Sequence, residues 1–283
     1  MTTDGPAPAT VPGHGRAGRD LRAATAVGLG LAALVLGTLF FWKPAFVGLA
    51  VVAITVAGWE LSAALARHGV RIPLVPILLG SVLMLVGAYV GGDGTLVVAL
   101  GLTIVAIVVW RLGESAPGYL RDVTAGILVA VYVPFLASFA MLLLQPDDGP
   151  WRVLTCILVV AASDTGGYIA GVLAGRHPMA PTVSPKKSWE GFAGSVLACL
   201  AVGVFAVVVA LDGDWWAGAA LGAAAVLTAT LGDLGESMIK RDLGLKDMST
   251  LLPGHGGIMD RLDSLLPTAP VAWLILTALV PVV

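Results

Sequence analysis

The chain has 283 residues, of which 58% are hydrophobic and 12% charged, and its formal net charge is −2. Soluble domains carry about 45–50% apolar and about 25% charged residues, so this composition excludes a disordered chain and indicates a membrane protein. The small net charge gives no support for nucleic-acid binding. The two cysteines, Cys156 and Cys199, lie inside apolar runs. They are predicted to be buried hydrophobes rather than a disulfide or metal ligands.

Residues 1–22 are rich in Gly, Pro and Thr and are predicted to form a disordered cytosolic tail. A helix needs about 20 apolar residues to cross a bilayer core of roughly 30 Å. Runs of this kind predict an all-α polytopic membrane protein with a bundle of about nine transmembrane helices. The expected spans are 23–41, 45–65, 73–91, 94–110, 122–144, 153–175, 191–211, 215–235 and 265–283. About five helices would fall in 23–150 and about four in 151–283, a C-terminal catalytic region with two polar loops.

The basic residues predict the orientation of this bundle. With nine helices, all but two of the 16 Lys and Arg residues fall on the same side as the N-terminus. The exceptions are Lys43 and Arg152. Because cytosolic loops carry an excess of Lys and Arg, the N-terminus is expected in the cytosol and the C-terminus outside.

Two segments on the predicted cytosolic side are too polar to be simple connectors. They are residues 176–191 and 232–264, and they hold four of the five lysines. A lysine ammonium binds phosphate as a compact point charge. The first segment contains Ser184-Pro-Lys186-Lys187-Ser188-Trp-Glu-Gly191, for which we favour anion binding over a bare lipid-headgroup patch.

Asp233 ends an apolar run, a position where a carboxylate usually faces a cavity or the bundle interior. If the helix continues, Glu236, Ser237 and Lys240 follow on the same face. The alternative is a solvated helix end with an internal Glu236–Lys240 pair. For Asp233 itself we favour a functional role.

Asp260 and Asp263 lie one helical turn apart after Pro-Gly-His-Gly-Gly. Two such carboxylates suit Mg²⁺, which takes one or two protein carboxylates and completes its shell with water and phosphate. The glycines let backbone amides approach a ligand at an expected helix start, which favours anion binding. His255 would either donate to a phosphate oxygen or cap that helix.

Two further carboxylates lie inside predicted spans. Asp164, in Ser-Asp-Thr-Gly-Gly-Tyr, indicates either a local break in the helix or a close approach between helices. We favour a functional role over a packed small-residue seam. Glu60 has no companion motif and stays unassigned, as a structural or gating residue. The residues alone therefore predict a cytosolic, metal-dependent phosphate site that acts on a lipid.

The stretch from Ser237 to Asp263 resembles the signature of the phosphatidate cytidylyltransferases, also called CDP-diacylglycerol synthases. That signature reads S-x-x-K-R-x4-K-D followed by P-x-H-G-G-x-x-D-R-x-D, and every fixed position is filled. Upstream, Ser163 to Tyr168 and Ser184 to Gly191 are similar to two further family blocks. Gly167, where the family usually has Ala, is the one departure. The resemblance covers about residues 160–264.

The resemblance implies that CTP and phosphatidate react to CDP-diacylglycerol and pyrophosphate with Mg²⁺, at the cytosolic face of a bacterial plasma (inner) membrane. It implies that the first metal ligands are Asp233 and Asp260, with Asp263, Asp164 and Asp247 around them. The CTP phosphates would be bound by Lys240, Arg241 and Lys246, and phosphatidate or the triphosphate by Ser184, Lys186, Lys187 and Ser188. The phosphate pocket would be lined by His255, Gly256 and Gly257, and substrate would also be bound by Ser237 and Arg261. The resemblance also suggests a homodimer, and the number of carboxylates leaves room for a second cation, such as a monovalent one.

Rival interpretations are a secondary transporter, a CTP-dependent lipid kinase, a synthase for another lipid and an inactive scaffold. Polar residues on one side and the lack of a visible inverted repeat disfavour a transporter. The filled signature disfavours the others. The motif of the CDP-alcohol phosphotransferases is not found in this sequence.

Overall fold

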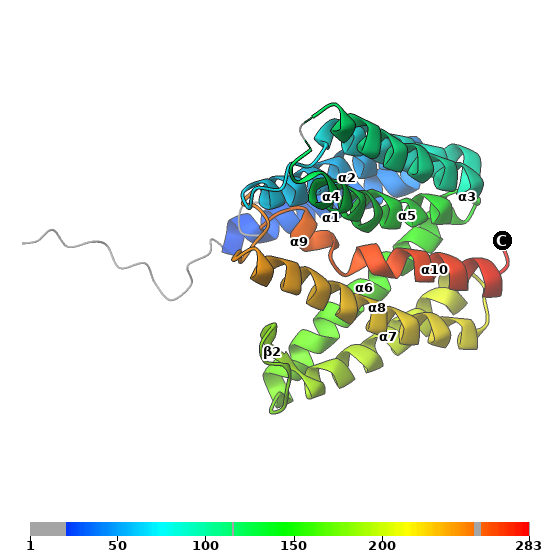
Figure 1. Ribbon diagram of the computed structural model, residues 1–283. Coiled ribbons are helices and arrows are strands. Elements are labelled where there is room, and N and C mark those ends of the chain that lie inside the picture. The colour runs from blue at the N-terminus through cyan, green and yellow to red at the C-terminus, as the bar shows by residue number, and fades with distance from the viewer. Residues whose placement is uncertain (1–20, 115, 252–255, 283) are drawn as a thin grey trace, which may run out of the picture.

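The computed structural model describes residues 21–114, 116–251 and 256–282, with side chains from residue 27 onward. It is helical apart from one small hairpin (Figure 1). The predicted tail lies outside the described residues, except that residues 21 and 22 begin α1. The elements are α1 (Leu21–Phe41), α2 (Lys43–Ala66), α3 (Leu74–Leu112), α4 (Tyr119–Ala130), the π-helix η1 (Val131–Phe135), α5 (Leu136–Leu144), α6 (Gly149–Ala174), β1 (Pro178–Ala180), β2 (Ser184–Ser188), α7 (Trp189–Ala210), α8 (Trp215–Asp242), α9 (Met259–Leu262) and α10 (Leu265–Leu279).

Within the described residues, seven helical segments are long and apolar enough to cross a membrane. The all-α membrane class is therefore confirmed, but the count of nine is not. The predicted spans 73–91 and 94–110 both fall on α3 and its N-cap Pro73, and α3 is interrupted at Gly92 with φ 75° and ψ −164°. The first predicted span falls in α1, whose residues with described side chains include the apolar stretch Val27–Phe41. Orientation relative to a membrane stays a prediction.

The span 119–144 is built from three helical pieces, with Pro134 inside the π-helical turn. Proline has no backbone N–H to donate to the preceding turn, so the helix ladder is interrupted there. Both cysteines are buried, as predicted.

The second half of the chain is a layer of helices in which α7 packs against both α6 and α8, and α8 packs against α10. Small residues let α6 and α7 approach closely: a Cβ at Gly166 would lie 2.7 Å from the carbonyl oxygen of Gly194. The helix α6 continues past Asp164 without a break. The Asp-Thr-Gly-Gly motif therefore marks a close approach between α6 and α7 and not a break in α6.

The first polar segment forms an antiparallel hairpin of β1 and β2, which the sequence did not predict. Ser188 ends β2 and caps α7, since its Oγ accepts a hydrogen bond from the Gly191 amide at 3.1 Å. Figure 1 shows this hairpin, the start of α1 and the α8–α9 connection at one end of the bundle, with the C-terminus at the other. The two predicted polar segments are thus brought to one end.

Candidate active site

A cavity of about 420 Å³ lies between α6, the hairpin, α7, α8 and the segment of α9 and the residues just after it. Its polar lining combines carboxylates, cations and hydroxyls from segments far apart in the sequence. These residues are Ser163, Asp164, Ser184, Lys186, Lys187, Ser188, Ser195, Thr230, Asp233, Asp260, Arg261, Asp263 and Ser264. Nine residues predicted to form the site are therefore brought together around this single space.

Asp233 links α8 to the hairpin across this cavity. Its Oδ2 lies 2.5 Å from Lys187 Nζ, and the two side chains are 33% and 25% exposed. Ser237 Oγ donates to Asp233 Oδ1 at 3.3 Å, one turn further along α8. The helix α8 thus continues past Asp233, as the prediction of a shared polar face with Glu236, Ser237 and Lys240 required.

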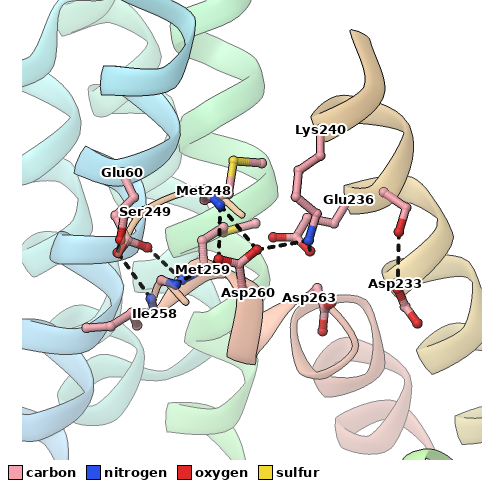
Figure 2. Close-up of polar contacts among 12 residues, drawn as sticks. Glu60, Asp233, Glu236, Lys240, Met248, Ser249, Ile258, Met259, Asp260 and Asp263 are labelled. Carbon is pink, nitrogen blue, oxygen red and sulfur yellow. Dashed lines mark hydrogen bonds and ion pairs between the residues drawn. The ribbon is translucent and has the colours of Figure 1, made fainter. Parts of the chain in front are cut away.

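Lys240 lies at the centre of a buried charged cluster rather than in the cavity lining. Its Nζ lies 2.6 Å from Glu236 Oε2 and 2.9 Å from Asp260 Oδ1 (Figure 2). The Lys240, Glu236 and Asp260 side chains are 15%, 0% and 4% exposed. An ammonium this buried is stabilised by its two carboxylates, so the contacts that Lys240 already makes are structural ones.

Asp260 is also surrounded by backbone donors. Its Oδ2 accepts from the Met248 amide at 3.0 Å and from the Gly257 amide at 2.8 Å. Both oxygens therefore have hydrogen-bond or ion-pair partners, and the carboxylate ties the loop after α8 to the start of α9. Its predicted role as a first metal ligand is untested, and these partners would compete with a cation.

Within this cluster, Glu236 has a second carboxylate neighbour, Asp263. Glu236 Oε1 is buried and has no hydrogen-bond partner within the described residues. The Asp263 carboxylate interacts electrostatically with both Glu236 and Asp233. Asp164, on α6, is in turn within electrostatic reach of Asp233 and Asp263. Neighbouring carboxylates of this kind need a proton or a cation between them.

The remaining predicted site residues that the structure describes do not line the cavity. Arg241 is exposed and donates through Nε to the Val183 carbonyl at 3.4 Å, and Lys246 and Asp247 are exposed in the loop after α8. The backbone at Gly256 adopts a positive φ of 80°, and the Gly257 amide binds Asp260. His255 lies outside the described residues. Their predicted roles stay predictions.

Two carboxylates outside the predicted set shape the site. Glu190 Oε2 accepts the backbone amides of Arg176 and His177 at 3.1 and 3.2 Å, and Oε1 lies 2.5 Å from His177 Nδ1. It thus holds the base of the hairpin closed. The other is Glu60, which contacts the α9 segment. Its only sequence signal was a lone carboxylate in an apolar run.

Over residues 21–114, 116–251 and 256–282, no three Asp, Glu, His or Cys side chains converge at metal-binding spacing. This does not conflict with a Mg²⁺ site, since that ion uses one or two protein carboxylates and takes its other ligands from water and phosphate. Glu236 Oε1, which has no hydrogen-bond partner among the described residues, and the carboxylates of Asp233, Asp263 and Asp164 are the hard oxygen donors that such an ion prefers.

Fold and site together define a polytopic membrane protein with a cavity lined by charged side chains at one end of its helix bundle. Comparison with known proteins narrows this class. The sequence profile of the Cytidylyltransferase family matches residues 22–279. The chain therefore belongs to this family.

Curated relatives agree over most of the chain. A phosphatidate cytidylyltransferase from Mycobacterium bovis is 44% identical over 277 residues, covering 93% of this chain and 90% of the relative. The protein of the same name from Mycobacterium leprae is 44% identical, again over 93% of this chain and 90% of its own. That from Haemophilus influenzae is 32% identical over 85% of this chain and 93% of its own.

Proposed function

We propose that this protein transfers the cytidylyl group of CTP to phosphatidate, which yields CDP-diacylglycerol and pyrophosphate. The names of its relatives support this reaction. The observation that carries the proposal is that acidic and basic residues of three separate sequence blocks share one cavity. A cavity at the end of a membrane bundle suits one lipid substrate and one water-soluble substrate.

In this reaction a phosphate oxygen of phosphatidate attacks the α-phosphorus of CTP. A new P–O bond forms, the bond from the α-phosphorus to the bridging oxygen breaks, and pyrophosphate leaves with the electron pair. The nucleophile is already an anion, so the chain does not have to remove a proton. The difficulty is to hold two polyanions in line, which requires positioning and positive charge.

We assign that positive charge to three cations of the cavity lining. Lys186 and Lys187 lie on β2 and Arg261 on α9, and all three line the cavity. Lys187 is neutralised by Asp233 in this structure, so a substrate phosphate would compete with Asp233 for its ammonium. Ser184, also on β2, adds a hydroxyl donor beside these charges.

We further propose that Asp233 and Asp263 hold Mg²⁺, with Asp164 and Glu236 beside them. The ion would neutralise phosphate charge and polarise the reacting phosphoryl group. The chain's own carboxylates fix where that charge sits, and Lys240 keeps Glu236 and Asp260 in place. Asp260 and Asp247, and a second cation, stay weaker alternatives.

The positions of the basic residues support a cytosolic active site in a bacterial inner membrane. The N-terminal end of the bundle carries both the hairpin and the cavity. CTP is made in the cytosol, so this orientation gives it direct access. A homodimer stays a prediction from the resemblance.

The test is the incorporation of radiolabelled CTP into lipid by the purified protein in detergent, with phosphatidate and Mg²⁺, with and without EDTA. Asp233→Asn and Asp263→Asn are each expected to lower the rate by about 10²–10³-fold, the loss seen when one electrostatic stabiliser is removed. Asp93→Asn is the matched control, because Asp93 is exposed and does not line the cavity.

No labelled lipid from well-folded wild type would refute the proposed reaction. Activity that is unchanged by EDTA would refute the metal. Normal activity in both cavity variants, with metal dependence intact, would move the metal ligands to Asp260 and Asp164.

A further inference from the structure

Glu60 is a carboxylate buried in the half of the chain that carries no family motif. It lies on α2, near the cytosolic end predicted for that helix, and is only 1% exposed. A buried carboxylate is unfavourable unless hydrogen bonds or a cation compensate it. Its partners therefore show what it is there to hold.

Those partners come from the signature region, about 190 residues further along the chain. Glu60 Oε1 accepts from Ser249 Oγ at 2.5 Å and from the Ile258 amide at 3.1 Å. Its Oε2 accepts from the Met259 amide at 2.8 Å. Figure 2 shows the carboxylate facing these donors, with Asp260 immediately beyond them.

Gly257 provides an independent sign that this contact is built in. A Cβ at this position would lie 2.7 Å from Glu60 Oε2 and 2.9 Å from Oε1. Such a spacing is too short for a side chain, so Gly257 leaves room for the carboxylate. The backbone amides after the glycines were expected to bind a phosphate, but here those of Ile258 and Met259 bind Glu60.

We infer that Glu60 is a positioning residue for the active site. It fixes the amides of Ile258 and Met259, and the next residues in the chain are Asp260 and Arg261, which line the cavity. The first half of the molecule thereby sets where the signature residues stand. The inference that this placement matters for turnover rests on the proposed function.

The first experiment measures hydrogen–deuterium exchange in the peptide covering 256–264, without substrate. Glu60→Gln replaces one acceptor oxygen by an NH₂ group, which opposes a backbone N–H. We expect exchange at Ile258 and Met259 to accelerate at least about tenfold, and kcat to fall by about 10²-fold, the loss that a misplacement of about 1 Å produces. The KM for CTP should change less than kcat, since two of the three cavity cations, Lys186 and Lys187, stay in place.

The second experiment exchanges size across the contact. Gly257→Ala alone should push the carboxylate away and lower kcat. Glu60→Asp is shorter by one methylene, so Glu60→Asp with Gly257→Ala should be more active than Gly257→Ala alone. If the double variant is no more active than Gly257→Ala alone, Glu60 does not act through this contact.

Asp122→Asn is the matched control. Asp122 is also a fully buried carboxylate of the first half, but its donors are Arg71, Arg111 and Arg121. It should lower overall stability and leave exchange at 256–264 unchanged relative to the rest of the chain. Equal local exchange in Asp122→Asn and Glu60→Gln would overturn the inference.

If Glu60→Gln does not fold, Ser249→Ala removes a single donor and should accelerate exchange in the same peptide to a smaller degree. Wild-type exchange in a folded Glu60 or Ser249 variant refutes the positioning role. Because exchange is read without substrate, a wild type that makes no CDP-lipid would refute the proposed function and leave this test standing.

Discussion

Lys240 offers a sharp prediction because its two carboxylate partners are almost fully buried. Lys240→Met keeps the length of the side chain but removes the ammonium. Glu236 and Asp260 would then be left at 0% and 4% exposure without their shared counter-charge. Removal of one partner of a buried ion pair typically destabilises a protein by about 3–5 kcal/mol.

For a chain of this size, 1 kcal/mol corresponds to roughly 2–4 °C in Tm, so a fall of about 6–20 °C is expected. Thermal unfolding in detergent, followed by tryptophan fluorescence, measures it. Glu236→Gln combined with Lys240→Met removes one of the two stranded charges. The double variant should recover roughly 0.5–3 kcal/mol relative to the sum of the single effects.

The opposite pattern would refute this reasoning. If Lys240→Met keeps the wild-type Tm and raises only the KM for CTP, Lys240 holds nucleotide phosphate, as the resemblance implied. If Tm falls and the KM for CTP is unchanged, the role of Lys240 is to stabilise the buried cluster. The two outcomes separate a structural cation from a substrate-binding one.

Three further predictions concern other parts of the molecule. Lys187→Met should lower kcat/KM by about 10–100-fold through one lost charged hydrogen bond, and a normal kcat/KM would contradict this. Its Tm should change little, because the Lys187–Asp233 pair is partly open to solvent and solvent-screened pairs contribute only about 0–1 kcal/mol. Glu190→Gln should speed hydrogen exchange in 178–188, whereas a protected hairpin would show that Glu190 is dispensable. Arg152→Met removes the hydrogen bonds to Asp148 and to the Leu276 and Val280 carbonyls. It should lower the free energy of unfolding by about 3–5 kcal/mol without changing the KM for CTP. A raised KM would be inconsistent with the place of Arg152 away from the cavity.

The features that the sequence predicted well depend on spacing within one element. Asp233, Glu236, Ser237 and Lys240 share a face whenever α8 is helical, because three or four residues make one turn. The Asp233–Ser237 and Glu236–Lys240 contacts follow from that spacing alone. The gathering of the two polar segments at one end followed from the apolar runs between them.

Features that depend on contacts between distant segments were not predicted. Spacing within α2 says nothing of Ser249 or Met259, so Glu60 had no assignable role. Asp260 likewise binds Met248 and Lys240, which lie 12 and 20 residues before it in the chain. The hairpin was missed because β1 has only three residues, and the Glu190 contacts at its base join residues 13 and 14 positions apart. The helix count differed because α3 continues across Gly92 with a change of direction in place of a polar loop.

The contact between Glu60 and the signature segment has a consequence for how the chain is made. Ser249 lies 189 residues after Glu60, and a ribosome adds about 5–20 residues per second. For roughly 10–40 s the nascent chain therefore carries this carboxylate before any of its three donors has been synthesised. During that interval Glu60 has none of these partners, so closing this contact is one of the last events in the assembly of the cavity.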